Sequence, residues 1–327
     1  MTRPSHRTTR TTRTLLALFV AIGLLVDSVG AQQAAPLHTV VLARLAPSAL
    51  LWLHAIAEDQ GLYAANGVRI QDVQAQNSAA LVQAVASNSA NAGIALGDNA
   101  IAAIDQGAPV IIAGGILTRP VLRLFGAGDS MDDLRGKAIT AGAVAGGTTN
   151  LMLYQLRAAG ITAADVQIVA VPNSRDRVIG MQNGELAGGL LIPPFDELAL
   201  AEGFKLLDVY RDYWLQTPLV FNKTWAETNR AAAEGTAQAL AAAAAWIYDP
   251  ANRAEAIRIL AAYTGAETAI AEAAYEFIVV DQQAIGPDLT VPAESLTNIF
   301  MINAVLQGSE MPEVDVARYY DPSYLGR

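Results

Sequence analysis

The sequence contains no cysteine, and its 327 residues include only three histidines. The absence of cysteine excludes a disulfide framework, a thiol nucleophile, a cysteine-ligated metal and a lipid-modified cysteine. Charged residues make up only 16% of the chain and aromatic residues 6%, whereas 53% are hydrophobic. This composition offers ample material for hydrophobic cores, so it indicates a folded protein and argues against disorder.

Catalytic motifs are also missing. Beyond the first 31 residues the only histidines are His38, which begins a predicted strand, and His54, which lies on a predicted apolar helix, and we interpret both as structural. No histidine pair has metal-binding spacing, and no G-x-S-x-G nucleophile motif occurs. We therefore expect no catalytic residue, no metal and no cofactor, and predict that the protein is not an enzyme.

The N-terminus has the pattern of a cleavable signal peptide. Four arginines (Arg3, Arg7, Arg10 and Arg13) precede the apolar run 15–26, and the small residues Val29, Gly30 and Ala31 follow. The run of 12 residues is shorter than the roughly 20 that a membrane-spanning helix needs. We predict a signal peptide over residues 1–31, cleavage after Ala31 and secretion to the periplasm.

Acidic residues dominate the predicted mature chain. Removing residues 1–31 takes away four arginines and one aspartate, which changes the net charge from −10 to −13. Nucleic acids and anionic membranes bind basic surfaces, so neither is expected as a partner.

From residue 38 onward, short apolar segments alternate with helical segments that end at glycine. Predicted strands begin near residues 38, 68, 91 and 109, and a second set begins near 137, 166, 186 and 205. The similar spacing predicts two α/β units of one architecture, and the alternation predicts parallel sheets.

Two extended connections are predicted between these units, over residues 118–128 and 210–222, and the remainder is predicted to be helical over 231–248, 252–263, 267–279 and 293–306. If these last helices return to the first unit, the chain crosses between units twice. We therefore predict lobe 1 from residues 37–120 plus 215–327, lobe 2 from residues 121–214, and a hinge between them.

Four motifs occur in one order along the chain. They are 57–68 (AEDQGLYAANGV), 133–139 (DLRGKAI), 184–188 (GELAG) with Pro193 and Pro194, and 245–250 (AWIYDP). Together they resemble the solute-binding proteins of ABC importers that handle sulfonates, taurine, nitrate and the pyrimidine precursor of thiamine. The resemblance implies a two-lobed α/β fold of the type II periplasmic binding protein kind, a monomer, a small-molecule ligand in the interlobe cleft, and an ABC permease in the inner membrane as partner.

Ligand-binding residues are expected in loops that follow strands, because ligands of open α/β sheets bind beyond the carboxyl ends of the strands. The segment Gly147, Thr148 and Thr149 is the strongest candidate, since glycines let a ligand approach the backbone and a helix N-terminus favours anions. Arg119 is predicted to clamp a carboxylate or sulfonate, with a salt bridge to a surface acid as the alternative. The other candidates are Arg44, Pro47, Ser48, Trp52, Asn77, Asp98, Asn99, Asn173, Pro194, Phe195 and Tyr213.

These residues leave the ligand class open. A small organic anion, such as an aromatic carboxylate or a sulfonate, is the first hypothesis. Asp98 would repel an anion but accept a hydrogen bond from an amino group, so an amino-substituted heterocycle is the second, unless Asp98 only caps the helix that follows. The aromatic candidates Trp52, Phe195 and Tyr213 have core or hinge packing as their alternative. An enzyme on the same scaffold and a periplasmic sensor also remain open.

Overall fold

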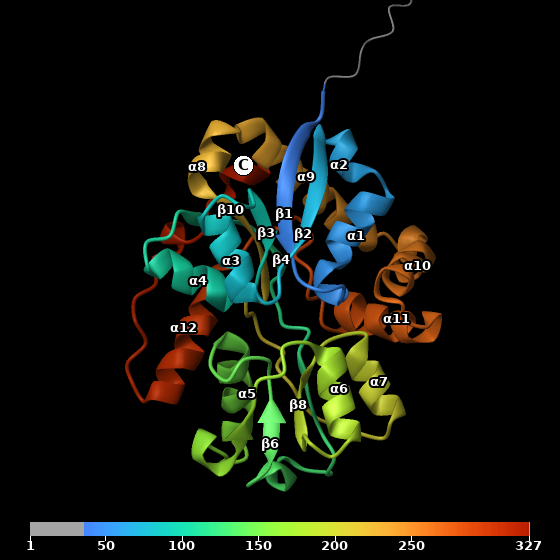
Figure 1. Cartoon of the computed structure of the whole chain (residues 1–327), viewed down its shortest axis with the longest axis vertical. Coiled ribbons are helices and arrows are strands. Elements are labelled where there is room, and N and C mark those ends of the chain that lie inside the picture. The colour runs from blue at the N-terminus through green and yellow to red at the C-terminus, as the bar shows by residue number, and fades with distance from the viewer. Residues whose placement is uncertain (1–35, 327) are drawn as a thin grey trace, which may run out of the picture. The chain divides into compact units, whose positions relative to one another are not determined.

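A computed structural model of the chain describes residues 36–326. The predicted signal peptide, residues 1–31, lies outside these residues. Two five-stranded sheets form the framework of residues 37–326 (Figure 1). The first sheet contains β1 (His38–Arg44), β2 (Val68–Gln74), β3 (Ala92–Ile94), β4 (Val110–Leu117) and β10 (Thr217–Asn222). The second contains β5 (Arg123–Gly126), β6 (Ala138–Thr140), β7 (Gln167–Ile168), β8 (Gly188–Leu191) and β9 (Lys205–Val209).

The two sheets have the same topology. Their strand orders are β2-β1-β3-β10-β4 and β7-β6-β8-β5-β9, so each sheet has its fourth position filled by a strand from a connecting segment. That strand is antiparallel to its neighbours in both sheets. The prediction of parallel sheets was therefore wrong for one strand in each, because β5 and β10 lie in the two segments expected to be plain connections.

The strand sequences explain how deeply the sheets are buried. All eight residues of β4 and all six of β10 are buried. A short, continuous apolar run of this kind is typical of a strand covered on both faces. β2 is the opposite case, since it forms an edge of the first sheet and most of its residues are exposed.

Helices cover both sheets, and we call each sheet with its helices a lobe. Lobe 1 has α1 (Trp52–Asp59), α2 (Leu62–Ala65), α3 (Ser78–Ala86) and α4 (Gly97–Asp105), and lobe 2 has α5 (Gly147–Arg157), α6 (Ser174–Gln182) and α7 (Phe195–Ala201). After β10 come α8 (Lys223–Thr228), α9 (Arg230–Ile247), α10 (Arg253–Thr264), α11 (Thr268–Tyr275) and α12 (Ala293–Gln307).

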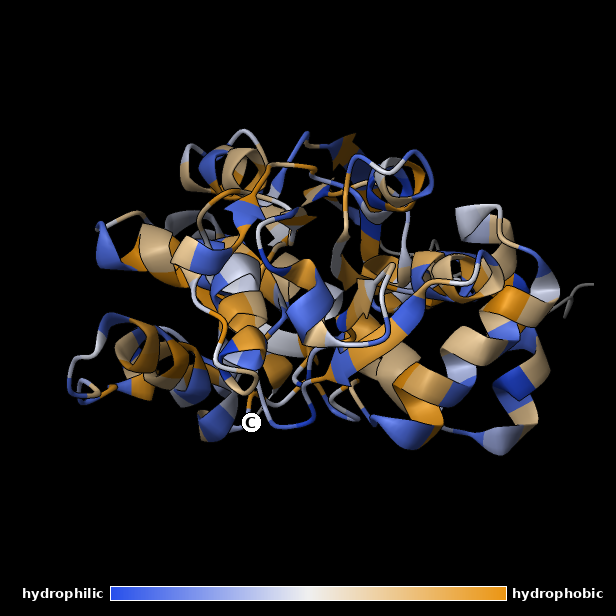
Figure 2. Cartoon of the chain, turned by 90° about the horizontal axis from the view of Figure 1, so that it is seen from below, coloured by the Kyte–Doolittle hydropathy of each residue, from blue (hydrophilic) through white to orange (hydrophobic). Residues whose placement is uncertain are grey.

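The long helix α9 shows why these helices form where they do. Ten of its 18 residues are alanine, the residue with the highest helix propensity, and their small side chains allow close packing against α1 and α2. Gly235 is required at one such approach, because a Cβ there would lie 2.3 Å from the backbone oxygen of Asn66. In Figure 2, hydrophobic and hydrophilic residues alternate along the helices, as expected for helices with one face on a core.

Most predicted elements match the structure within two or three residues, with one notable change near residue 276. The helix predicted over 267–279 is α-helical only to Tyr275 and continues as a π-helix over Glu276–Asp281. No helix within residues 36–326 is long and apolar enough to cross a membrane.

Candidate functional site: the interlobe loops

The loops at the carboxyl ends of the strands meet between the two lobes. The backbone N–H of Ala49, which follows β1, donates to the backbone oxygen of Pro193, which follows β8, at 3.2 Å. The N–H of Gly147, the first residue of α5, donates to Oδ2 of Asp98 at the start of α4, at 2.7 Å. Loops from both sheets are thus in direct contact, and ligands of open α/β sheets bind at this end of the strands.

The loop from Gly142 to Gly147 leads from β6 into α5 and contains the strongest predicted candidates. Gly142 and Gly146 have φ angles of 124° and 141°, which residues with a Cβ rarely adopt. Gly147, Thr148 and Thr149 form the first turn of α5. The hydroxyl of Thr149 donates to the backbone oxygen of Ala143 at 2.7 Å, which fixes the loop.

Asp98 has a different role from the helix cap that sequence reasoning offered as its alternative. It lies inside the first turn of α4, whose N-cap is Leu96, and its carboxylate instead accepts the first N–H of α5 in lobe 2. Oδ1 of the same carboxylate is buried, and among residues 36–326 it has no hydrogen-bond partner. Burial raises the pKa of Asp98, and the N–H groups of Gly147 and Asn99 oppose this shift.

Arg177 on α6 is a residue of this region that sequence reasoning missed. Its guanidinium is buried and donates to three backbone oxygens, those of Val171 at 2.8 Å and Pro172 at 2.9 Å in the loop between β7 and α6, and that of Leu190 at 2.6 Å in β8. A Cβ on Gly142 would lie 2.9 Å from its Nη2. Within the described part of the chain no carboxylate pairs with Arg177. Burial lowers its pKa to about 10, so it is still cationic at neutral pH.

The polar candidates Asn77 and Asn173 occupy equivalent places in the two lobes. Each is the N-cap of a nine-residue helix, and its side chain accepts the N–H three residues later at 2.9 Å. The serine after each accepts an N–H from the residue 18 positions further on, Leu96 in lobe 1 and Ile192 in lobe 2. The repeated Asn-Ser pair is the sequence signal that could have aligned the lobes.

The predicted arginines have partners within the protein. Arg44 forms an ion pair with Asp72 at 2.7 Å. Arg119 donates to the backbone oxygen of Gln283 at 3.1 Å and lies over the Tyr213 ring, 4.1 Å from its centroid. Arg119 and Tyr213 are thus brought together in the connecting segments, whereas Arg44 is engaged at the sheet edge.

Among the remaining candidates, Trp52 is a core residue. It is 1% exposed, and its Nε1 donates to the backbone oxygen of Ala256 at 3.0 Å. Phe195, at the start of α7, is half-buried with the guanidinium of Arg175 5.4 Å from its ring centroid. Pro47, Ser48, Asn99 and Pro194 all lie in or beside the interlobe loops, next to the Ala49 and Asp98 contacts.

The two connecting segments run side by side and are tied together by buried glutamines. The N–H of Trp214 donates to the backbone oxygen of Thr118 at 2.9 Å, and Oε1 of Gln216 accepts the N–H of Val121 at 2.6 Å. Nε2 of Gln282, at the end of the π-helix, donates to the backbone oxygens of Pro120 and Tyr210 at 3.0 and 2.9 Å. Gln282 therefore bridges both segments.

Replacing Gln282 by methionine is expected to loosen these segments. The variant leaves two buried carbonyl groups without their donor, which costs about 1–3 kcal/mol of unfolding free energy. Faster hydrogen exchange of the Trp214 and Val121 amides, measured by mass spectrometry, would report the change. Gln307→Ala, at an exposed position at the end of α12, is the control and should leave that exchange unchanged.

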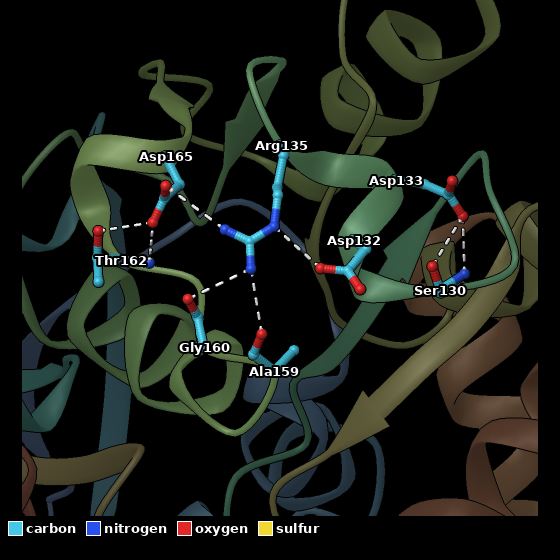
Figure 3. Close-up of polar contacts among 8 residues, drawn as sticks. All are labelled: Ser130, Asp132, Asp133, Arg135, Ala159, Gly160, Thr162 and Asp165. Atoms are coloured by element: carbon cyan, nitrogen blue, oxygen red, sulfur yellow. Dashed lines mark hydrogen bonds and ion pairs between the residues drawn. The ribbon is translucent and has the colours of Figure 1, made fainter.

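The motif over residues 133–139 lies at the opposite end of lobe 2 and serves the fold. Arg135 donates to Asp132 at 2.9 Å and to the backbone oxygens of Ala159 and Gly160, and forms an ion pair with Asp165 at 3.4 Å (Figure 3). Arg135 therefore connects the segment before β6 to the residues that follow α5. The motif thus identifies the architecture rather than the binding site.

Metal chemistry has no support in the described residues. Over residues 36–326 no group of three or more histidine, cysteine, aspartate or glutamate side chains is placed to hold a metal ion. Two cavities of about 390 Å³ in the described residues lie elsewhere, one beside α6 and β6 and the other between α1 and α10.

Two α/β lobes of the same topology, each completed by a strand from a connecting segment, define the two-lobed α/β fold of type II periplasmic binding proteins. This confirms the predicted fold class. The chain belongs to the NMT1-like family, whose family model matches residues 34–261. A search of the curated proteins found no match.

Solved structures share the fold at low sequence identity. The alkanesulfonate-binding protein SsuA from Xanthomonas axonopodis pv. citri, bound to MOPS, matches with a TM-score of 0.68 and 17% identity over 89% of this chain and 99% of that one. The aliphatic sulphonate binding protein SsuA from Escherichia coli matches with 0.67 and 18% over 87% and 92%. The desulfurization enzyme DSZB matches with 0.59 and 14% over 88% and 98%.

Proposed function

We propose that the protein is the periplasmic solute-binding component of an ABC importer and captures a small organic anion between its lobes. The observation that carries the ligand class is Arg177, a buried guanidinium without a carboxylate partner among residues 36–326, beside the loop that leads into α5. A buried cation without a counterion is costly, and an anion bound at this loop would compensate it. The amide end of α5 adds a partial positive charge.

The mechanism of capture follows from the two connecting segments. Residues 37–120 with 215–327 and residues 121–214 are proposed to move as two bodies about these segments, which Gln282 ties together. A ligand that contacts both sets of loops binds the closed arrangement better than the open one, so it shifts the population toward closure. The permease in the inner membrane would recognise the closed form of a monomeric binding protein in the periplasm.

The binding proteins among the structural neighbours support transport as the role. DSZB leaves an enzyme on the same fold as the competing function. Mass spectrometry of the purified protein after incubation with candidate ligands separates the two, because turnover of any ligand would contradict a role limited to binding.

The anion assignment is tested by replacing Arg177 with glutamine and measuring binding of carboxylates and sulfonates by calorimetry. We expect at least about 10-fold weaker binding, since a lost charged hydrogen bond or ion contact is worth about 1.5–3 kcal/mol. Arg177→Lys keeps the charge and should retain part of the affinity. Arg69→Gln, at an exposed position near the start of β2 where its guanidinium donates to Thr39, is the control.

Arg119 is the competing anion clamp, and the same titrations decide between the two arginines. Because its guanidinium already donates to Gln283 and lies over Tyr213, Arg119→Ala is expected to change anion affinity less than Arg177→Gln does. A larger loss for Arg119→Ala than for Arg177→Gln would reverse the assignment.

A further inference from the structure

Asp98 and Asp196 occupy the same place in the two lobes. Each is the second residue of the helix that follows the third strand of its unit, α4 after β3 and α7 after β8. Asp196 is fully buried, and Asp98 is partly exposed as a residue but has its Oδ1 buried, so both carboxylates need hydrogen-bond donors or a cation. The two lobes supply different partners for their carboxylates.

In lobe 2 the need is met by an arginine on the antiparallel strand. Arg123 lies opposite Leu191 in the β5–β8 pairing, and its Nε donates to Oδ2 of Asp196 at 2.7 Å. Asp196 also accepts the N–H of Glu197 through Oδ1 at 2.8 Å. Both oxygens of the lobe 2 carboxylate therefore have a partner.

In lobe 1 the corresponding strand position has no donor to offer. The β10–β3 pairing places Leu219 opposite Ile94, and one step further the N–H of Ala95 donates to the backbone oxygen of Pro218 at 3.2 Å. Proline thus stands where lobe 2 has Arg123. Asp98 receives the N–H of Gly147 on Oδ2, and the nearby N–H of Asn99 also favours its ionised form. Oδ1 is nevertheless buried, and among the described residues no hydrogen bond reaches it.

Arg177 in lobe 2 is the opposite case, a buried cation without a carboxylate partner among the described residues. Arg177 is the fourth residue of α6, and the fourth residue of the equivalent helix α3 is the buried Leu81. Among residues 36–326 the acceptors of the Arg177 guanidinium are all backbone oxygens. Both unbalanced charges border one loop, since a Cβ on Gly142 would lie 2.9 Å from Arg177 Nη2 and a Cβ on Gly147 would lie 2.4 Å from Asp98 Cβ.

We infer that the ligand is amphoteric: its acidic group binds at the amino end of α5 near Arg177, and an amino group or other N–H donor on the same molecule binds Oδ1 of Asp98. Asp98 is then the residue that determines specificity, because it accepts from the ligand a hydrogen bond like the one that Asp196 accepts from Arg123. This inference rests on the proposed function, because it assumes an acid bound between the lobes. It also excludes simple acids as good ligands, since they would leave Oδ1 unpaired and meet a second negative charge.

The test uses pairs of acids that differ by one amino group, propionate with β-alanine and benzoate with 3- and 4-aminobenzoate. Each acid is titrated by calorimetry into the wild type, Asp98→Asn and the control Asp105→Asn, which removes a carboxylate from the far end of α4. In at least one pair we expect the amino acid to bind the wild type about 10–100-fold more tightly than the plain acid. Asp98→Asn should reduce this ratio to about threefold or less, and Asp105→Asn should keep it.

The outcomes separate the two proposals. If acids bind but no amino group improves affinity, or if the preference survives Asp98→Asn, the amphoteric ligand is wrong and the anion site stands. If no acid in the set binds the wild type, both are overturned. Each ratio compares the affinities of one protein variant for two acids. A general loss of stability in Asp98→Asn lowers both affinities and therefore leaves the ratio unchanged.

Discussion

Replacing Arg123 by leucine is expected to lower the unfolding free energy by about 3–5 kcal/mol, the cost of leaving buried carboxylates without their cation. Asp196 is fully buried and Arg123 is 7% exposed, and Nη2 of Arg123 also pairs with Glu197. The guanidinium lies over the ring of Phe277 from the π-helix, 4.5 Å from its centroid, so the loss extends to a contact between the lobes. Denaturant unfolding at pH 7.5 measures the effect.

The control for this variant is Arg258→Leu. Arg258 pairs with Asp59 and Glu255 but its side chain is 50% exposed, so its removal should cost no more than about 1 kcal/mol. Equal losses for the two variants would show that the ion pairs of Arg123 with Asp196 and Glu197 stabilise the protein no more than exposed ion pairs do.

The loss in Arg123→Leu should shrink as the pH falls. In the wild type burial raises the pKa of Asp196 to about 6, while Arg123 acts to lower it. Without the arginine the folded-state pKa rises further above the unfolded value, so the folded state binds a proton more readily and gains stability as pH decreases through that pKa. The difference in unfolding free energy from the wild type should therefore be smaller at pH 5 than at pH 7.5.

Gly147→Ala is expected to weaken anion binding by about 10-fold or more while the unfolding free energy changes little. A Cβ at this position would lie 2.4 Å from Cβ and 2.6 Å from Cγ of Asp98, far inside contact distance. Overpacking of this size costs about 1–3 kcal/mol. Because the two residues belong to different lobes, opening relieves the clash without unfolding either core. Calorimetry and small-angle scattering measure affinity and opening.

Gly97→Ala provides the contrast. Its Cβ would lie 2.0 Å from the backbone oxygen of Leu215, and the N–H of Gly97 donates to the backbone oxygen of the adjacent Gln216 at 3.1 Å. Because this hydrogen bond holds the two segments together, opening of the lobes cannot relieve the clash, and we expect a loss of stability. The double variant Gly147→Ala with Asp98→Gly removes the clashing atoms and should reduce the opening seen in Gly147→Ala, although it also removes the hydrogen bond between Asp98 and Gly147. Unchanged scattering and affinity in Gly147→Ala would mean that the loop adapts.

Much of the architecture was predictable because the sequence carries local periodicity. The strands beginning at residues 38, 68 and 205 and the helix from Ser174 lie where alternation and capping residues predicted them. The strands β5 and β10 were missed as strands, since their pairing partners lie far away in the chain and a short apolar run in a connection has no periodicity of its own.

The candidate site was predictable only in part. The loop with Gly147 was identified because glycine and threonine before a helix indicate an exposed amide end. Arg177 was overlooked beside Arg175, since spacing along α6 does not tell which of two arginines has its guanidinium buried under backbone oxygens. Trp52 was considered for the cleft, yet its indole donates inside the core.

By itself, the sequence determined the alternating α/β order, the two similar units and the absence of cysteine chemistry, because composition and periodicity are properties of neighbouring residues. Only the tertiary structure decided that Asp98 meets the amide end of α5 across the lobes, and that Pro218 stands where lobe 2 has Arg123. Whether the carboxylates of Asp98 and Asp196 are balanced depends on residues 49 and 73 positions away, which contact them only once the chain has folded.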